Sequence, residues 1–85
     1  MYYLYILYSL QMKKYYIGST SMLPELRLKQ HLLNHKGFTS KAKDWEIVYR
    51  ETYTSIEDAR SREFQIKRWK SSLRIQQLIT RSSTE

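Results

Sequence analysis

The sequence predicts an α+β fold, a small three-stranded antiparallel sheet flanked by helices. Two short runs rich in tyrosine, isoleucine and leucine, residues 2–8 and 14–19, lie close enough together to form a hairpin. A third run, residues 45–53, alternates its side chains with the period of a strand. Helix-start signals at Pro24 and Ser55 each precede spaced apolar residues. These observations together favour strands and helices in mixed order.

Length and composition limit what the chain can be. Eighty-five residues suffice for one core, so we expect a single domain over residues 1–80 and a flexible end at 81–85. A net charge of +7 favours a polyanionic partner. The absence of cysteine excludes disulfides, thiolate metal sites and cysteine nucleophiles, and it fits a cytoplasmic location. Residues 1–10 are apolar but too short to span a bilayer and lack a signal-peptide pattern, so no membrane association is expected.

The hairpin is expected to separate aliphatic from aromatic side chains. If its turn lies within residues 9–13 and Tyr8 pairs with Lys13, Tyr5 lies opposite Tyr16. This register sorts most aliphatic side chains onto one face with Tyr8 and Tyr15. Tyr3, Tyr5, Tyr16 and Gly18 would then share the other face.

The next helix should run over residues 24–34. Proline is favoured as a first helical residue, because its missing N–H is not needed there. Its buried surface is predicted to come from Leu26 and Leu33 and, more obliquely, from Leu28 and Leu32.

Arg27 and His31 lie four residues apart and should project side by side from this helix. Either residue could equally be an ordinary helix-surface side chain. His31 and His35 have the spacing of a zinc pair, but no glutamate follows the first histidine and no cysteine could complete a site, so zinc is disfavoured. In the following loop or single turn, Lys36, Lys41 and Lys43 could contact a nucleic-acid backbone or simply be solvated.

The last helix is predicted to begin at Ser55, with Asp58 three residues on, and to bury a stripe made of Ile56, Ala59, Ile66 and Leu73. Glu63 falls inside this apolar stripe. An acid there is explained either by pairing with Lys67 or a tyrosine hydroxyl, or by a metal-ligand role. The basic run that follows, including Lys67 and Lys70, could face water or a phosphate backbone.

The order Tyr5, Tyr16-Ile17-Gly18, Arg27, His31 and Glu63 resembles the GIY-YIG nuclease superfamily. The ending Ile66-Lys67-Arg68-Trp69-Lys70-Ser71 is similar to that of its small stand-alone bacterial members. The resemblance covers residues 2–79 and implies a three-stranded antiparallel sheet surrounded by helices. Three departures are visible: the first motif here reads Leu4-Tyr5-Ile6, Ser19 stands where some branches have a lysine, and residues 73–85 lack the asparagine that several branches have beyond the glutamate.

The resemblance implies a metal-dependent endonuclease that hydrolyses phosphodiester bonds. Glu63 would hold one divalent cation, Mg²⁺ or another such as Mn²⁺, because hard cations prefer oxygen ligands and keep several waters. Arg27 would grip the scissile phosphate with its planar fork of donors. Tyr5 or Tyr16 would activate or position the attacking water, with His31 assisting proton transfer. A phenol needs nearby cations to serve as a base, and the sequence leaves the choice of tyrosine open.

The implied partner is nucleic acid, with DNA favoured over RNA. The competing hypothesis is a binding module without catalysis, in which exposed tyrosines stack on bases and lysines follow the backbone. A partner-binding domain whose charge only aids solubility is a third possibility. The sequence does not indicate an oligomeric state.

Overall fold

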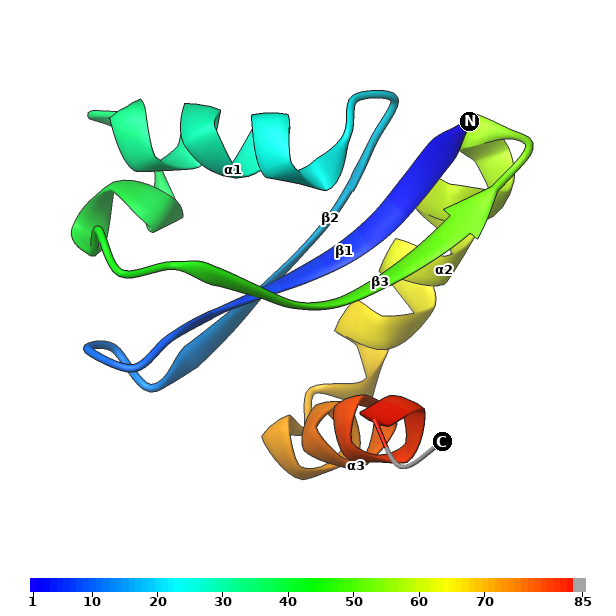
Figure 1. Cartoon of the computed structure of the whole chain (residues 1–85). Coiled ribbons are helices and arrows are strands. Elements are labelled where there is room, and N and C mark those ends of the chain that lie inside the picture. The colour runs from blue at the N-terminus through cyan, green and yellow to red at the C-terminus, as the bar shows by residue number, and fades with distance from the viewer. Residues whose placement is uncertain (84–85) are drawn as a thin grey trace.

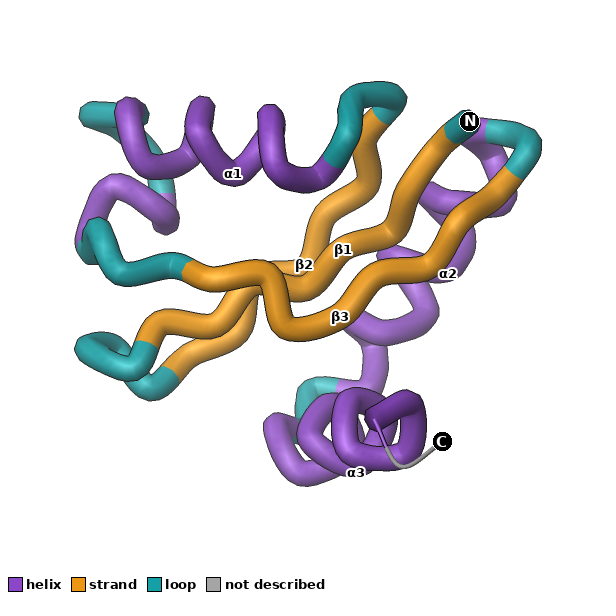
Figure 2. Tube along the Cα trace, in the orientation of Figure 1, coloured by secondary structure: helices purple, strands orange, loops and turns teal. Residues whose placement is uncertain are grey.

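The computed structural model describes residues 1–83 and has the predicted α+β architecture (Figure 1). Along the chain the elements are β1 (Tyr2–Ser9), β2 (Lys14–Thr20), α1 (Pro24–Leu33), the 3₁₀ turn η1 (Phe38–Lys41), β3 (Glu46–Tyr53), α2 (Ile56–Trp69) and α3 (Ser72–Ser83). The three strands form one antiparallel sheet in the order β2-β1-β3, so β1 is central and β2 and β3 are edges. Figure 2 shows the long diagonal course of this sheet between the helices.

The hairpin register differs from the predicted one. Tyr5 pairs with Gly18, not with Tyr16, and Tyr8 pairs with Tyr15, a shift of two residues along β2. Ser9 is fully buried and ends β1, because its hydroxyl donates to Asp44 (2.6 Å) and accepts from the Met12 N–H (3.1 Å). The turn therefore starts after Ser9. Since side chains alternate with a period of two, this shift leaves the predicted sorting of faces intact.

The sheet separates two small cores. On one face, Leu4, Ile6 and Ile17 pack with Ile66 of α2 and Ile75 of α3. On the other face, Tyr5, Leu7, Ala42 and Trp45 form a second cluster, against which Leu28 and Leu32 of α1 pack. Helix α1 thus lies on one side of the sheet and α2 on the other, as Figure 1 shows.

The third strand does not keep the uniform alternation predicted for residues 45–53. It begins at Glu46, and its pairing with β1 shifts between Ile6 and Leu7, which face Tyr49 and Ile47 respectively. This bulge leaves Val48 as the extra residue and moves the following side chains to the opposite face. Ile47 consequently packs in the cluster beside α1, whereas Tyr49 packs against the core beneath α2.

Helix α1 begins at Pro24 as predicted, but its buried side is different. Leu26 and Leu33 are 45% and 76% exposed, whereas His31 is only 2% exposed. The expectation that Leu26 and Leu33 form the main buried surface was therefore wrong. Hydrogen bonds made by the His31 ring orient the helix, as described below, and they turn Leu28 and Leu32 inward.

The final helical region is two helices, not the single long helix predicted. Ser55 caps α2 by accepting from the Asp58 N–H (3.1 Å), as expected. Lys70 then adopts a left-handed conformation and ends α2, and the Ser71 hydroxyl accepts from the Arg74 N–H (3.2 Å) at the start of α3. The predicted stripe holds for Ala59 and Ile66, both 0% exposed.

The prediction that the stripe continues to Leu73 was wrong. Leu73 is 63% exposed, and Ile75 of α3 is buried in its place. Helix α3 continues to Ser83, through the first three residues of the stretch expected to be flexible; residues 84–85 lie outside the described structure. Over residues 1–83, none of the helices has the length and apolar character needed to cross a bilayer.

Substitutions at buried and at exposed helix positions should differ in their effect on the free energy of unfolding. Ile66→Ala removes a fully buried side chain and should lower the free energy of unfolding by about 2–5 kcal/mol. Leu33→Ala, at a position that is 76% exposed, should change it by less than about 0.5 kcal/mol. Urea denaturation of both variants gives the comparison, and a large loss for Leu33→Ala would contradict the observed orientation of α1.

Candidate active site

Tyr5 lies at the centre of the site, pressed against the backbone of Gly18. It is 1% exposed and pairs with Gly18 across the hairpin. A Cβ atom on residue 18 would lie 2.5 Å from the Tyr5 hydroxyl oxygen and 2.6 Å from Cζ. Only glycine leaves room for this ring, so Gly18 serves a close approach between two strands.

His31 of α1 holds the Tyr5 hydroxyl from the other side. The Tyr5 oxygen lies 2.9 Å from Nε2 of His31, and the Thr39 hydroxyl of η1 lies 3.0 Å from Nδ1. A neutral imidazole has one donor and one acceptor nitrogen. Either Tyr5 donates to Nε2 while Nδ1 donates to Thr39, or Thr39 donates to Nδ1 while Nε2 donates to Tyr5.

Burial and neighbouring charges set the protonation of this pair. Burial lowers the pKa of His31 to about 4, and the positive charge of Arg27 contributes to the fall. Burial raises the pKa of Tyr5 to about 12; Tyr16 adds to the rise and the Arg27 guanidinium opposes it. Near neutral pH the pair is therefore a neutral imidazole hydrogen-bonded to a neutral phenol.

Tyr16 lies beside this pair, in a more open position. Its ring is half-buried and meets His31 edge-on, with centroids 4.8 Å apart. Its centroid lies 6.4 Å from that of Tyr5, and it stacks on Phe38 of η1 at 6.3 Å. Tyr16 thus has a side toward solvent, which the buried Tyr5 ring lacks.

Arg27 lies one turn before His31 on α1. It is partly exposed, and its Nη1 donates to Oε1 of Gln30 (2.6 Å). Its charge influences the pKa of both Tyr5 and His31, which places the guanidinium next to them. A guanidinium has five N–H donors, so most of its donor capacity remains after the bond to Gln30.

Glu63 approaches from the opposite face of the sheet. Its Oε1 accepts from the Ser19 hydroxyl (2.6 Å) at the end of edge strand β2, and its Oε2 pairs with Lys67 (2.5 Å). The Glu63 side chain is 22% exposed. Its negative charge is the smallest of the named contributions to the pKa of Tyr5, behind burial and Tyr16. Four of the predicted residues, Tyr5, Tyr16, Arg27 and His31, therefore lie together on the α1 face, and Glu63 reaches the same edge strand from the other face through Ser19.

The lysines considered for nucleic-acid binding have different surroundings. Lys43 donates to the carbonyl oxygens of Leu32 (2.9 Å) and Asn34 (2.8 Å), so it caps the end of α1. Lys67 is held by Glu63. The remaining three are exposed: Lys36, Lys41, whose Nζ lies 5.9 Å from the centroid of Phe38, and Lys70.

Two residues that matter for the geometry were not predicted to act in the site. Ser19 was noted only as a departure from the resembled family, yet it binds Glu63. Its alternation with Gly18 along β2 could have placed it on the α2 face. Thr39 fixes the His31 ring and is 3% exposed, but no sequence pattern marks a buried threonine in a short turn.

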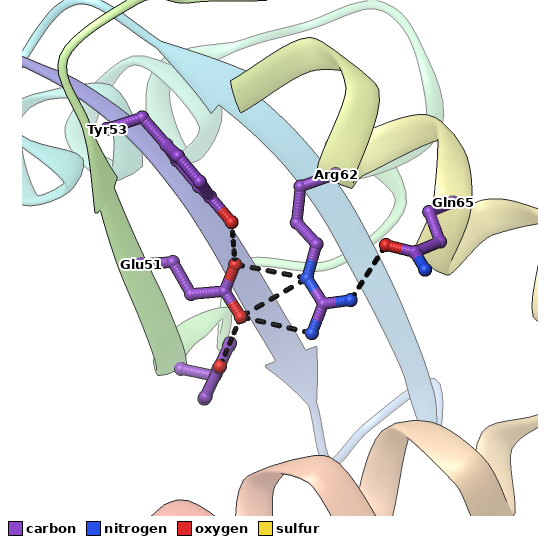
Figure 3. Close-up of polar contacts among 5 residues, drawn as sticks. Glu51, Tyr53, Arg62 and Gln65 are labelled. Carbon is purple, nitrogen blue, oxygen red and sulfur yellow. Dashed lines mark hydrogen bonds and ion pairs between the residues drawn. The ribbon is translucent and has the colours of Figure 1, made fainter. Parts of the chain in front are cut away.

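A second polar cluster joins β3 to α2 and is separate from this site. Figure 3 shows Glu51 accepting hydrogen bonds from Tyr53 and from Arg62, which also binds Gln65. The hydroxyl of Tyr49 completes the set around Glu51. Although burial acts to raise it, these hydrogen bonds hold the pKa of Glu51 below its usual value. These side chains bind one another, so we expect the cluster to act as a structural clamp that holds α2 against β3.

The donor set for a metal is small. Within residues 1–83 no group of three or more histidine, aspartate or glutamate side chains could together hold a metal ion. Both ring nitrogens of His31 are hydrogen-bonded, to Tyr5 and to Thr39, and His35 is exposed. Glu63 is an acid whose charge contributes to the pKa of the Tyr5 phenol. Each of its oxygens has a second lone pair beyond the hydrogen bond it accepts, so it can still offer one ligand to a hard cation that keeps its waters.

A comparison with known protein families assigns the chain to one of them. The family model described as GIY-YIG catalytic domain matches residues 1–77, almost the whole chain. No curated protein and no solved structure is similar enough to be matched with it.

The close approach at Gly18 predicts the effect of a single methyl group. Gly18→Ala should displace the Tyr5 ring, break its bond to His31 and lower the free energy of unfolding by about 1–3 kcal/mol. Denaturation of the variant measures the loss. In a Tyr5→Leu background the methyl meets no phenol, so the same substitution should cost clearly less. Equal costs in both backgrounds would show that the two residues do not interact.

Burial of neutral His31 predicts a pH dependence of stability. Because its pKa is about 4 in the folded chain and near 6.5 when unfolded, the unfolded state binds more protons between these values. Stability should therefore fall as the pH is lowered, by about 2 kcal/mol between pH 7 and pH 5. Denaturation at both pH values, compared with His31→Gln, measures this term. If the free energy of unfolding of the parent fell between pH 7 and pH 5 by no more than that of His31→Gln, the expectation would be contradicted.

Proposed function

Because the chain belongs to the GIY-YIG catalytic-domain family, a family of nucleases, we propose that it is a divalent-metal-dependent endonuclease that hydrolyses phosphodiester bonds in DNA. The observation that supports this best is the convergence on the Tyr5 hydroxyl. His31 binds it directly, Tyr16 lies beside it, and the positive charge of Arg27 acts on its pKa, whereas Glu63 reaches the neighbouring edge strand from the other face through Ser19. The positive charge of Arg27 beside this phenol suits a substrate that carries negative charge.

Arg27 is proposed to bind the scissile phosphate. It is partly exposed, lies on the same face of α1 as His31, and has five N–H donors, of which one at Nη1 binds Gln30. Its planar fork matches two oxygens of one phosphate. The other arginine near α1, Arg50, is already paired with Glu25.

Glu63 is proposed to hold one divalent cation, Mg²⁺ or Mn²⁺, with waters and substrate oxygens as the remaining ligands. Such an ion polarises the phosphoryl group and stabilises charge on the leaving oxygen. Ser19 orients the carboxylate, and Lys67 neutralises it when no cation is bound. Both contacts leave one lone pair on each carboxylate oxygen for coordination.

The two tyrosines are proposed to have different roles. Tyr5 is buried and has a pKa of about 12, so it is suited to orient the attacking water or a phosphate oxygen and poorly suited to lose its proton. His31, with a pKa of about 4, is a weak proton acceptor at neutral pH and is proposed to position Tyr5. Tyr16 is closer to solvent and is therefore the proposed base, which would accept the proton from water as a phenolate, with Arg27 and the bound cation as the charges that favour that form.

Lys36, Lys41 and Lys70 are proposed to contact the nucleic-acid backbone, since all three are exposed. Lys43 and Lys67 are proposed to add positive potential to the surface while making their internal bonds. We infer a cytoplasmic location from the absence of cysteine in the sequence.

Cleavage of plasmid and branched DNA with Mg²⁺ tests the proposal. Glu63→Gln should reduce the rate at least about 100-fold, because it removes the charge that holds the cation, and Arg27→Lys should also reduce it strongly. Glu57→Gln, an exposed acid on the same helix, is the matched control and should cleave as the parent does.

Chelation of the metal should stop the reaction in every variant. Equal cleavage by the parent and Glu63→Gln would indicate a contaminant and refute the assignment. Metal-independent, salt-sensitive binding without cleavage would instead favour the non-catalytic nucleic-acid-binding module.

A further inference from the structure

A basic pocket lies beside Glu63, on the α2 face of the sheet. Its walls come from the hairpin turn and from the junction of α2 with α3, and its floor is apolar. The lining residues are Lys13, Lys14, Tyr15, Ile17, Ile66, Lys67, Lys70, Ser71, Ser72 and Ile75. They include four lysines and no aspartate or glutamate, and of these lysines Lys67 is paired with Glu63 beside the pocket.

Lys67 joins this pocket to the candidate active site. It lines the pocket and also the shallow hollow around Glu63 that Ser19, Arg60 and Phe64 complete. Its Nζ lies 2.5 Å from Oε2 of Glu63. An extended ligand bound at Glu63 could therefore continue into the pocket along one side of Lys67.

Two of the pocket's lysines occupy backbone positions that favour glycine. Lys13 has φ 55° and Lys70 has φ 48°, and over residues 1–83 no other non-glycine residue has a positive φ. Lys13 closes the hairpin turn, where its N–H donates to the Ser9 carbonyl (2.7 Å), and Lys70 ends α2. Glycine is the usual residue in both settings because it has no Cβ to clash in the left-handed region. A role of the two lysine side chains in ligand binding would explain why neither position is occupied by glycine.

The chemistry of the pocket defines what could fill it. Ammonium groups and serine hydroxyls can donate to phosphate oxygens. The floor, made by Tyr15, Ile17 and Ile66, is apolar and therefore gives a free phosphate ion few hydrogen bonds. It can, however, pack against a sugar and a base. Lys14 borders the pocket, yet its Nζ lies 6.0 Å from the centroid of Phe38, on the other face of the sheet. Lys13, Lys67 and Lys70 remain as the phosphate-binding group.

From these observations we propose that the pocket binds one nucleotide unit of the nucleic-acid strand next to the scissile phosphate. Its phosphate contacts Lys13, Lys67 and Lys70, and its sugar and base lie on the apolar floor. The inference rests on the proposed function, since it extends that substrate along the strand. It adds Lys13 to the substrate-binding residues and gives Lys70 a defined site.

The double variant Lys13→Gly/Lys70→Gly separates binding from folding. Glycine relieves both left-handed positions, so the melting temperature should stay equal or rise. Affinity for a fluorescent single-stranded oligonucleotide, measured in chelator, should fall about tenfold, and the slope of log affinity against log salt should fall in magnitude by about 1.4. Lys29→Ala removes an exposed charge outside the pocket and is the control. Unchanged affinity in the double variant, or a loss no larger than that of the control, would overturn the proposal.

Two further measurements identify the ligand and its place. A neutral methylphosphonate at one backbone position should weaken binding to the parent but not to the double variant. A mononucleotide should displace the oligonucleotide at concentrations where inorganic phosphate does not, and equal displacement would refute a nucleotide unit. All of these assays are done without metal. An inactive parent that still shows the binding effects would refute only the nuclease assignment, whereas an active parent without them would refute only the pocket.

Discussion

The ring of Tyr5 lies against the backbone of Gly18, with its hydroxyl held by His31 of α1. This contact depends on the absence of a side chain at residue 18, because a Cβ there would lie 2.5 Å from the phenol oxygen. The same contact fixes the pairing of β1 with β2 and sets the rotation of α1, whose histidine is buried while Leu26 and Leu33 face outward. Burial then keeps His31 neutral and raises the pKa of Tyr5. The protonation states of Tyr5 and His31 thus depend on the absence of a side chain at residue 18.

The position of β2 at the edge of the sheet explains how groups from opposite faces act together. Tyr5, Tyr16 and the α1 residues lie on one face, and Glu63 reaches the other face through Ser19. At the centre of a sheet the neighbouring strands would separate them. At an edge, a substrate can contact both faces of the sheet. A nucleic-acid strand bound there as proposed could continue past Lys67 into the basic pocket. The clamp around Glu51 at the opposite edge holds α2 to β3 and so supports the position of Glu63.

Much of this arrangement could be predicted from the sequence, and what could not has identifiable causes. Side-chain alternation predicted the strands and sorted Leu4, Ile6 and Ile17 correctly, but it cannot distinguish registers that differ by two residues. The ordered tyrosine, arginine, histidine and glutamate residues indicated the candidate site. The spacing of apolar residues predicted the wrong buried side for α1, because the hydrogen-bonded His31 is buried there while Leu26 and Leu33 face outward. The break at Lys70 was missed because lysine is not a usual helix-ending residue, and the bulge at Val48 has no local signal.

In the proposed site, Glu63 and the tyrosines act together around edge strand β2, with Glu63 as the metal ligand. This proposal can be tested by titrating the isotope-labelled protein with Mn²⁺ and following paramagnetic broadening in NMR spectra. We expect broadening to centre on Glu63 and Ser19, to extend to Gly18 and Tyr5, and to disappear in Glu63→Gln. Broadening centred elsewhere, for example at Asp44 or Glu25, or broadening near β2 that survives Glu63→Gln, would contradict it.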